Sequence, residues 1–337
     1  MKRGESGLCL VVGVDKPSGM SSHDVVNACR RIFGEKRVGH TGTLDPLASG
    51  VLPICVGPAT RLDAYLVGHD KRYRVRVAFG AATTTDDRLG DVIREGAVPD
   101  EVLDPLYAYA FVASLVGPSK QLPPVYSAIK RDGKKACDEA RKGNVIELEP
   151  RDIEVYDARL VGIYGADGCE APAWEIDFHV SKGTYIRALA RDIGNAMGCP
   201  AHVAELRRMA VGSLTLDECM TLEALAELKE RAALDPVRLL GVRFVYADAE
   251  VERLVANGNA IAADKLVLCE RRRATASAEF CACTAGVRES CEPPADAEII
   301  AVIAENKLRA LYAYDEARRV FRSRCVFQTG VSRGVAY

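Results

Sequence analysis

The sequence contains no long apolar run. Crossing a bilayer takes about 20 consecutive apolar residues, whereas the apolar stretch at residues 8–14 ends directly in Asp15 and Lys16. A stretch this short, followed at once by charges, predicts a buried strand and not a secretory signal. The chain also has no internal repeat, so a repeat architecture is not expected. We therefore expect a cytoplasmic globular protein without a membrane segment.

Paired cysteine motifs are missing as well. The chain has 12 cysteines but no C-x-x-C spacing, and its C-x-C stands in a loose cluster of Cys269, Cys281, Cys283 and Cys291. Structural zinc sites usually need the paired spacing, so we expect no metal site here. Most other cysteines stand singly in apolar or helical surroundings, which is typical of buried thiols in a reducing compartment.

Neither sign of charge dominates, because the formal net charge is −2. Nucleic-acid-binding domains are usually basic, so the net charge by itself does not indicate one. The distribution is uneven: residues 1–80 hold 12 Lys and Arg against 7 Asp and Glu, and residues 118–143 hold 7 against 3. A polyanion could meet these basic segments on one face, although a mixed solvated surface explains the same counts.

What the sequence does contain is an unusual loop at residues 39–53, GHTGTLDPLASGVLP. Its glycines permit backbone angles closed to other residues, and Pro46 fixes the turn directly after Asp45. Such a loop can hold one carboxylate at a set position. Asp-Pro pairs also begin ordinary turns, so spacing alone leaves both a functional loop and a plain turn open.

This loop resembles the catalytic signature GHxGxLDPxAxGxLP of the TruB family of tRNA pseudouridine-55 synthases, with every fixed letter present. The resemblance is strong over about residues 8–245. It implies an α+β fold, the pseudouridine synthase fold, with a curved mixed sheet and flanking helices. It further implies that the chain isomerises uridine 55 in the T-loop of tRNA, with Asp45 as the nucleophile and without a cofactor.

The reaction sets the other residues that the site needs. The base must be turned out of its stack, a cation must keep the carboxylate ionised, an aromatic ring must hold the base, and a group must help remove the proton at C5. By resemblance, Tyr73 is the stacking ring and Arg187 the cation that pairs with Asp45. The other pocket residues implied by the resemblance are Tyr185, Leu206 and Asp87, the last as a second acid beside the arginine.

Further matches concern RNA binding. The resemblance implies that Lys16, in the segment DKPSG, helps to form the floor of the site, and that His40 enters the T-loop. Residues 123–133, PPVYSAIKRDG, resemble the family segment that clamps the T arm. In and after this segment, basic side chains suit phosphate contacts; they include Lys130, Lys134 and Lys135.

The chain departs from the family pattern at two positions. Thr84 stands where the family often has an aspartate, and Cys137 where it often has a tyrosine. The first departure predicts one acid fewer around Arg187, and the second removes an aromatic contact from the clamping segment. Neither changes Asp45 or Tyr73, so we expect an active enzyme.

The chain divides into two expected domains. Residues 1–242 form the catalytic domain, with an RNA-clamping thumb at about 118–143, and residues 243–337 form a PUA-like RNA-binding β domain with an insertion at 270–297. In the first domain, pattern predicts strands at 8–14, 71–79, 153–163 and 173–180, and helices at 23–33, 100–115, 134–141, 185–197 and 221–231. Residues 118–124 are expected to be an irregular connection.

Two other functions remain open. An RNA folding factor that opens and reanneals tRNA, with catalysis secondary, would need the same binding residues. A synthase for another structured RNA would share the catalytic set but differ in its specificity loop. Because binding alone needs no nucleophile, the set of Asp45, Tyr73 and Arg187 favours the enzyme. We expect a monomer without an obligate protein partner, acting on the tRNA T arm.

Overall fold

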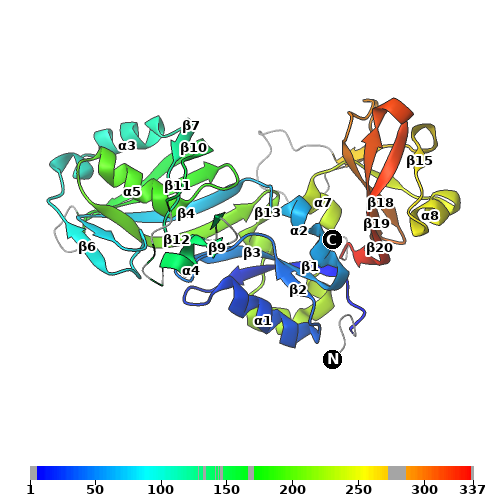
Figure 1. Ribbon diagram of the computed structural model, residues 1–337, viewed down its shortest axis with the longest axis horizontal. Coiled ribbons are helices and arrows are strands. Elements are labelled where there is room, and N and C mark those ends of the chain that lie inside the picture. The colour runs from blue at the N-terminus through cyan, green and yellow to red at the C-terminus, as the bar shows by residue number, and fades with distance from the viewer. Residues whose placement is uncertain are drawn as a thin grey trace.

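The computed structural model describes residues 6–334, apart from 128, 132–133, 141, 143, 145–146, 166–170 and 272–285. Two large β-sheets make up the molecule, one on the left and one on the right of Figure 1. Among the described residues, none of the helices combines the length and apolarity that crossing a membrane takes.

The larger sheet has nine strands. Its main path runs through β1 (Leu10–Lys16), β3 (Ser49–Val56), β12 (Ala201–Val211), β4 (Lys71–Phe79), β11 (Ala173–Val180), β10 (Arg151–Tyr164) and β7 (Gly117–Gln121). Strand β2 (Val38–His40) pairs with β3, and β13 (Leu214–Thr215) pairs with β12. Strands β3 and β12 are parallel neighbours. The two halves of the sheet therefore meet at the β3–β12 seam.

Strand β4 shows why the sequence pattern succeeds here. Tyr73, Val75 and Val77 are buried, whereas the alternate residues Arg72 and Arg74 are exposed or half-buried. A period of two is the signature of a strand with one buried face. The predicted strand with one basic face is confirmed, with the same bounds.

Helix α1 (Ser22–Phe33) lies below the sheet in Figure 1 and begins with a reciprocal cap. The Ser21 hydroxyl accepts from the Asp24 amide at 3.1 Å, and the Asp24 carboxylate accepts from the Ser21 amide at 3.0 Å. Such a capping box satisfies two amides that the helix itself leaves unpaired. Gly34 ends the helix at φ 59°, a left-handed angle that glycine adopts without strain. The helix predicted at 23–33 is confirmed.

The other helices of this part are α2 (Asp63–Leu66), α3 (Pro105–Ser114), α4 (Ala136–Ala140), α5 (Ile186–Ala196), α6 (Leu222–Leu228) and α7 (Pro236–Leu240). The short strands are β5 (Ala81–Thr83) with β6 (Val92–Glu95), and β8 (Lys130–Arg131) with β9 (Lys134–Lys135). Helix α5 confirms the helix expected at 185–197, and α6 is shorter than the one expected at 221–231.

Several expectations were wrong. The helix expected at 100–115 is interrupted, because the Asp104 carboxylate accepts from the Leu106 amide at 2.8 Å and starts a separate helix at Pro105. The irregular connection at 118–124 is largely strand β7, paired with β10. The helix expected at 134–141 begins as strand β9 and becomes helical at Ala136. The turn expected at residues 132–133 lies outside the described residues.

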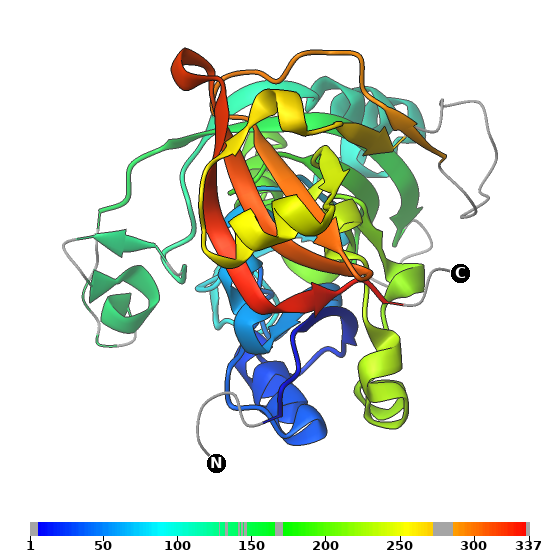
Figure 2. The same ribbon diagram turned by 90° about the vertical axis from the view of Figure 1, so that its right-hand side faces the viewer.

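The second sheet has seven strands, in the order β15-β20-β19-β18-β14-β16-β17. They are β14 (Phe244–Tyr246), β15 (Ile261–Ala262), β16 (Cys269–Arg271), β17 (Val287–Glu289), β18 (Ile299–Ala304), β19 (Lys307–Asp315) and β20 (Val320–Ser332). Helix α8 (Ala249–Ala256) packs across them (Figure 2). A β-rich C-terminal part is confirmed, whereas its exact boundary and its PUA-like character stay predictions.

The stretch at 270–297 is not wholly irregular. Arg271 pairs with Val287, so β16 and β17 extend the edge of the second sheet. This corrects the expectation of an unstructured insertion at those positions. Cys281 and Cys283 lie outside the described residues, so the structure does not bear on the expected absence of zinc there.

The two sheets share one apolar cluster. Val11 and Val51 of the first sheet belong to the same buried group as Phe244, Leu308 and Phe327 of the second. The end of β20 also reaches back to the first sheet, where the amide of residue 332 donates to the carbonyl of residue 9 at 2.8 Å. The C-terminal part is thus anchored by apolar burial as well as by hydrogen bonds.

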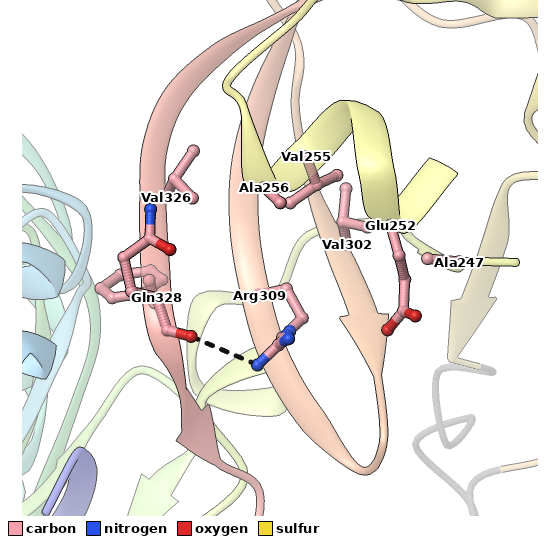
Figure 3. Close-up of a pocket in the computed structure, with 9 residues that line it drawn as sticks. Ala247, Glu252, Val255, Ala256, Val302, Arg309, Val326 and Gln328 are labelled. Atoms are coloured by element: carbon pink, nitrogen blue, oxygen red, sulfur yellow. Dashed lines mark hydrogen bonds between the residues drawn. The ribbon is translucent and has the colours of Figure 1, made fainter. Parts of the chain in front are cut away.

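A small cavity in the second sheet is shown in Figure 3. It measures about 30 Å³ and is bordered by Val255, Val302 and Val326, with Arg309 donating to the Gln328 carbonyl at 3.5 Å. This space suits a single water molecule. It is too small for a nucleotide, so the chemistry must be sought at the seam of the larger sheet.

Candidate active site

The loop between β2 and β3 is held on both sides of Asp45. The Ser22 hydroxyl donates to the Leu44 carbonyl at 2.9 Å and accepts from the Leu44 amide at 2.8 Å. After Asp45, the Pro46 carbonyl accepts from the Gly19 amide at 2.8 Å, and the Leu47 carbonyl accepts from a serine hydroxyl at 2.8 Å. The N-terminal segment DKPSGMSS therefore acts as a brace for the loop.

Asp45 and Arg187 form an ion pair, as the resemblance implied. Arg187 Nε lies 2.8 Å from Asp45 Oδ2. The arginine side chain is 5% exposed and the aspartate side chain 36% exposed. The carboxylate is therefore fixed from below by a buried cation while part of it faces solvent. A nearby guanidinium favours the ionised form of a carboxyl group, which is the form that a nucleophile requires.

The remaining donors of Arg187 are also occupied. Nη1 donates to the Thr85 carbonyl at 2.8 Å, and Nη2 donates to the Tyr126 carbonyl at 2.9 Å. Asp87 Oδ2 lies 3.7 Å from Nη1. The guanidinium thus links α5 to the β5–β6 loop, to the segment after β7 and to the Asp45 loop, which orients its fork geometry closely.

Thr84 shows how the chain manages without the additional acid. Its hydroxyl accepts from the Asp91 amide at 3.1 Å and so closes the β5–β6 loop. Asp87 is fixed in the same loop, because its Oδ1 accepts from the Thr85 hydroxyl at 2.7 Å and from the Leu89 amide at 3.0 Å. One acid and two main-chain carbonyls therefore surround Arg187 besides Asp45.

Tyr73 and Leu206 lie on the neighbouring strands β4 and β12. Both are 8% exposed, and both belong to the apolar cluster that also contains Leu44 and Leu47 of the catalytic loop. Tyr185 precedes α5, and its amide and carbonyl bond the two ends of the Gln121 amide group at 2.9 and 3.1 Å. Burial raises the pKa of Tyr185, so its phenol stays neutral at physiological pH.

His40 lies on β2 and borders a pocket of about 620 Å³ with Arg30, Lys36 and Arg37. Burial lowers the pKa of His40, so the imidazole is neutral near pH 7. Its Nδ1 is buried and lacks a hydrogen-bond partner in the part of the chain that is described. This geometry is compatible with the expected contact to RNA, which stays a prediction.

Lys16 is fully buried beneath the same loop. Its ammonium group donates to the carbonyls of Pro17 at 2.9 Å and Met20 at 2.6 Å. Burial lowers the pKa of Lys16 to about 8, opposed by the nearby Asp45 charge. Lys16 therefore carries its charge below about pH 8 and loses it above, and the charge stabilises the brace beside the nucleophile.

This titration predicts a pH effect. Turnover should fall as the pH rises through about 8, because the deprotonated Lys16 no longer supports the Asp45 carboxylate. Lys16→Met should lower turnover about 10-fold at pH 7 and should lack the fall near pH 8. The control is Lys71→Met, since burial also lowers the pKa of Lys71 to about 8, but its ammonium bonds the carbonyls of Val67 and His69. Identical pH profiles for wild type and Lys16→Met would contradict the prediction.

The thumb lysines are placed on one hairpin. Lys130 pairs with Lys135, and Arg131 pairs with Lys134 along β8 and β9. The structure does not bring these residues into the Asp45–Arg187 network. Their expected contacts with phosphates stay predictions.

One residue at the site was missed by the sequence analysis. Arg208 of β12 is buried under the catalytic loop, with its guanidinium bonded to main-chain carbonyls of that loop. Nothing in the run LRRM distinguishes it from its neighbour Arg207, which lies half-buried beside Asp15. The difference arises from which face of β12 each side chain occupies.

The sequence matches two family profiles. Residues 30–186 match the TruB family pseudouridylate synthase N-terminal domain, and residues 187–240 match the tRNA pseudouridylate synthase B C-terminal domain. Both matches fall in the part of the chain that builds the larger sheet and its flanking helices. The second profile begins at Arg187 and includes Leu206.

Curated relatives agree with these profiles. The chain is 42% identical over 254 residues to tRNA pseudouridine synthase B of Caldanaerobacter subterraneus subsp. tengcongensis, which covers 74% of this chain and 85% of that protein. It is 43% identical over 232 residues to the protein of the same name from Chromohalobacter salexigens, covering 69% of this chain and 72% of that one.

A solved structure extends the similarity of fold to the C-terminal part. The chain superposes on a structure titled as a Cbf5-Nop10-Gar1 complex with a TM-score of 0.65 and 23% sequence identity, covering 96% of this chain and 85% of the other. The α+β pseudouridine synthase fold is therefore confirmed.

Proposed function

The chain belongs to the TruB family of pseudouridylate synthases, and we propose that it isomerises uridine 55 in the T-loop of tRNA to pseudouridine. The observation that carries the proposal is the Asp45–Arg187 ion pair, a partly exposed carboxylate on a braced loop with a buried guanidinium 2.8 Å away. The curated relatives bear the name tRNA pseudouridine synthase B, which supports tRNA as the substrate. The T arm and position 55 follow from the motif resemblance.

The proposed reaction is an isomerisation within one nucleotide. The bond between the ribose C1′ and N1 of the base breaks, a bond between C1′ and C5 forms, C5 loses its proton, and N1 gains one. Asp45 supplies the electron pair that attacks the nucleotide, at the sugar or at the base, and is released at the end. The reaction needs no redox step.

The surrounding residues have distinct proposed roles. Arg187 keeps Asp45 ionised and oriented. The flipped uracil stacks on Tyr73, which also assists the transfer of the C5 proton. Leu206 and Tyr185 line the pocket, and Asp87 helps to hold Arg187. His40 fills the space that the flipped nucleotides leave in the T-loop.

We propose that the remaining parts of the chain bind and position the RNA. In this proposal residues 1–242 are the catalytic domain, residues 118–143 clamp the T arm, and residues 243–337 are a PUA-like RNA-binding domain. The enzyme acts as a monomer in the cytoplasm and without an obligate protein partner. The intact Asp45–Arg187 pair favours this enzyme over a pure RNA folding factor, which needs no nucleophile.

The proposal is tested by release of tritium from a T-arm stem–loop labelled at C5 of uridine. Loss of the C5 proton is obligatory, so wild-type protein should release one equivalent of tritium per stem–loop labelled at position 55. A stem–loop with cytidine at position 55 and labelled uridines elsewhere should release none. Binding of both RNAs without tritium release would instead support the RNA folding factor.

The thumb should control affinity through its charges. If Lys134 and Lys135 contact phosphates, replacing both with alanine should weaken binding to all tRNAs alike and reduce the dependence of log affinity on log salt by about two contacts. The rate of the bound complex should change little. Affinity measured at five salt concentrations decides this, because solvated lysines would leave the slope unchanged.

A further inference from the structure

Arg208 lies where it can control the catalytic loop from beneath. The residue is 1% exposed and sits on β12, next to the β3–β12 seam. Its Nε donates to the Val51 carbonyl at 2.7 Å, and its Nη2 donates to the Gly42 carbonyl at 3.0 Å. A longer contact of 3.4 Å joins Nη1 to the carbonyl of residue 43. One guanidinium thus bonds the loop on both sides of Asp45.

The backbone of Arg208 adds a second restraint. Gly50 faces Arg208 across the parallel pair, at φ +101°. A Cβ atom at Gly50 would lie 2.2 Å from the Arg208 carbonyl oxygen. Only glycine permits this approach and this backbone angle. The end of the loop is therefore fixed against the main chain of the residue whose side chain holds its beginning.

We propose that Arg208 is a positioning residue for the isomerisation, setting the place of Asp45 relative to the flipped nucleotide without touching the substrate. This inference rests on the proposed function. The three carbonyls bonded by the guanidinium belong to residues 42, 43 and 51, so a shift of Arg208 moves both strands of the loop together. Arg187 sets the charge and orientation of the carboxylate from the α5 side, and Arg208 sets the height of the loop from the β12 side.

The guanidinium is specific to this task. A planar fork with five donors can bond several carbonyls at fixed angles, whereas an ammonium group is a single point of charge on a flexible stem. Lysine at position 208 would keep the buried charge and much of the volume, but it could not bond residues 42 and 51 together. Displacing a catalytic group by about 1 Å can lower the rate about 100-fold.

A purely structural role predicts a different outcome. If Arg208 only stabilises the fold, a variant that remains folded should turn over bound substrate at the wild-type rate. Arg243 offers a matched control, because its largely buried side chain likewise bonds a carbonyl, that of Glu292 at 2.7 Å, and pairs with Glu298 at 2.6 Å. Arg243→Met should therefore lower stability without changing the turnover of bound RNA.

The experiment measures thermal unfolding, RNA affinity and single-turnover tritium release for wild type, Arg208→Lys, Arg208→Met and Arg243→Met, using the labelled T-arm stem–loop. We expect Arg208→Met to lower the single-turnover rate about 100-fold, with affinity within threefold, and Arg208→Lys to recover the unfolding temperature more completely than the rate. If Arg208→Met fails to fold, the rate of Arg208→Lys decides.

Two results separate the possible failures. A wild-type rate in folded Arg208→Lys, and in Arg208→Met where it folds, would overturn the positioning role while leaving the proposed function intact. Equal losses of rate in Arg243→Met and Arg208→Met would also overturn it, because the loss would then follow stability. Absence of tritium release from the wild-type protein would overturn the proposed function and this inference with it.

Discussion

Asp45→Asn is expected to abolish turnover while leaving RNA binding within a few-fold of wild type. A carboxamide is not a nucleophile at neutral pH, and loss of a nucleophile typically lowers the rate by roughly 10⁴-fold or more. The fold should persist, because the amide oxygen of asparagine can accept from Arg187 Nε in place of Asp45 Oδ2. Contacts to phosphates, which set affinity, lie elsewhere. Single-turnover tritium release and a binding titration on one stem–loop measure both quantities.

The matched control is Asp91→Asn, an exposed acid in the β5–β6 loop. Its carboxylate is not part of the Arg187 network, so its rate and affinity should equal those of wild type. A rate for Asp45→Asn within tenfold of Asp91→Asn would show that another group is the nucleophile.

Arg187→Met is expected to impair both the fold and the chemistry. The arginine is almost fully buried, and its removal leaves the carbonyls of Thr85 and Tyr126 without their donors. Breaking such a buried pair destabilises by about 3 kcal/mol, and the loss of charge beside Asp45 should lower the rate about 10³-fold. Chemical denaturation gives the free energy of unfolding, and tritium release gives the rate.

Arg191→Met separates the two effects. Arg191 lies one turn later on α5 and pairs with Asp86 at 3.0 Å, while also bonding the Leu122 carbonyl. Its loss should destabilise by about 1 kcal/mol and leave the rate of the bound complex within threefold. Similar losses of rate in Arg187→Met and Arg191→Met would mean that the Arg187 effect comes from general destabilisation.

Local patterns in the sequence were sufficient where one residue type determines the structure. The alternation of β4 gave its bounds, and Ser21, Asp24 and Gly34 marked the ends of α1. The Asp45 loop was recognisable because its glycines and prolines exclude regular structure and match a family signature. Its pairing with Arg187, 142 residues later in the chain, followed from the resemblance and from no local pattern.

The strands at the seam were not predictable in the same way. β3 continues directly from the catalytic loop, so its glycine and proline concealed a buried strand. β12 contains two register shifts against β4, and its sequence AHVAELRRMAV alternates poorly. The role of Arg208 depends on the side of β12 that it faces and on a parallel neighbour far away in the sequence. Tertiary packing decides both, so sequence alone left them out.

The most direct test of the account is to map pseudouridine, nucleotide by nucleotide, in an unmodified tRNA transcript incubated with the wild-type protein. The account predicts modification at position 55 in the T-loop and at no other uridine. Pseudouridine at another position, or an unchanged transcript despite binding, would contradict it.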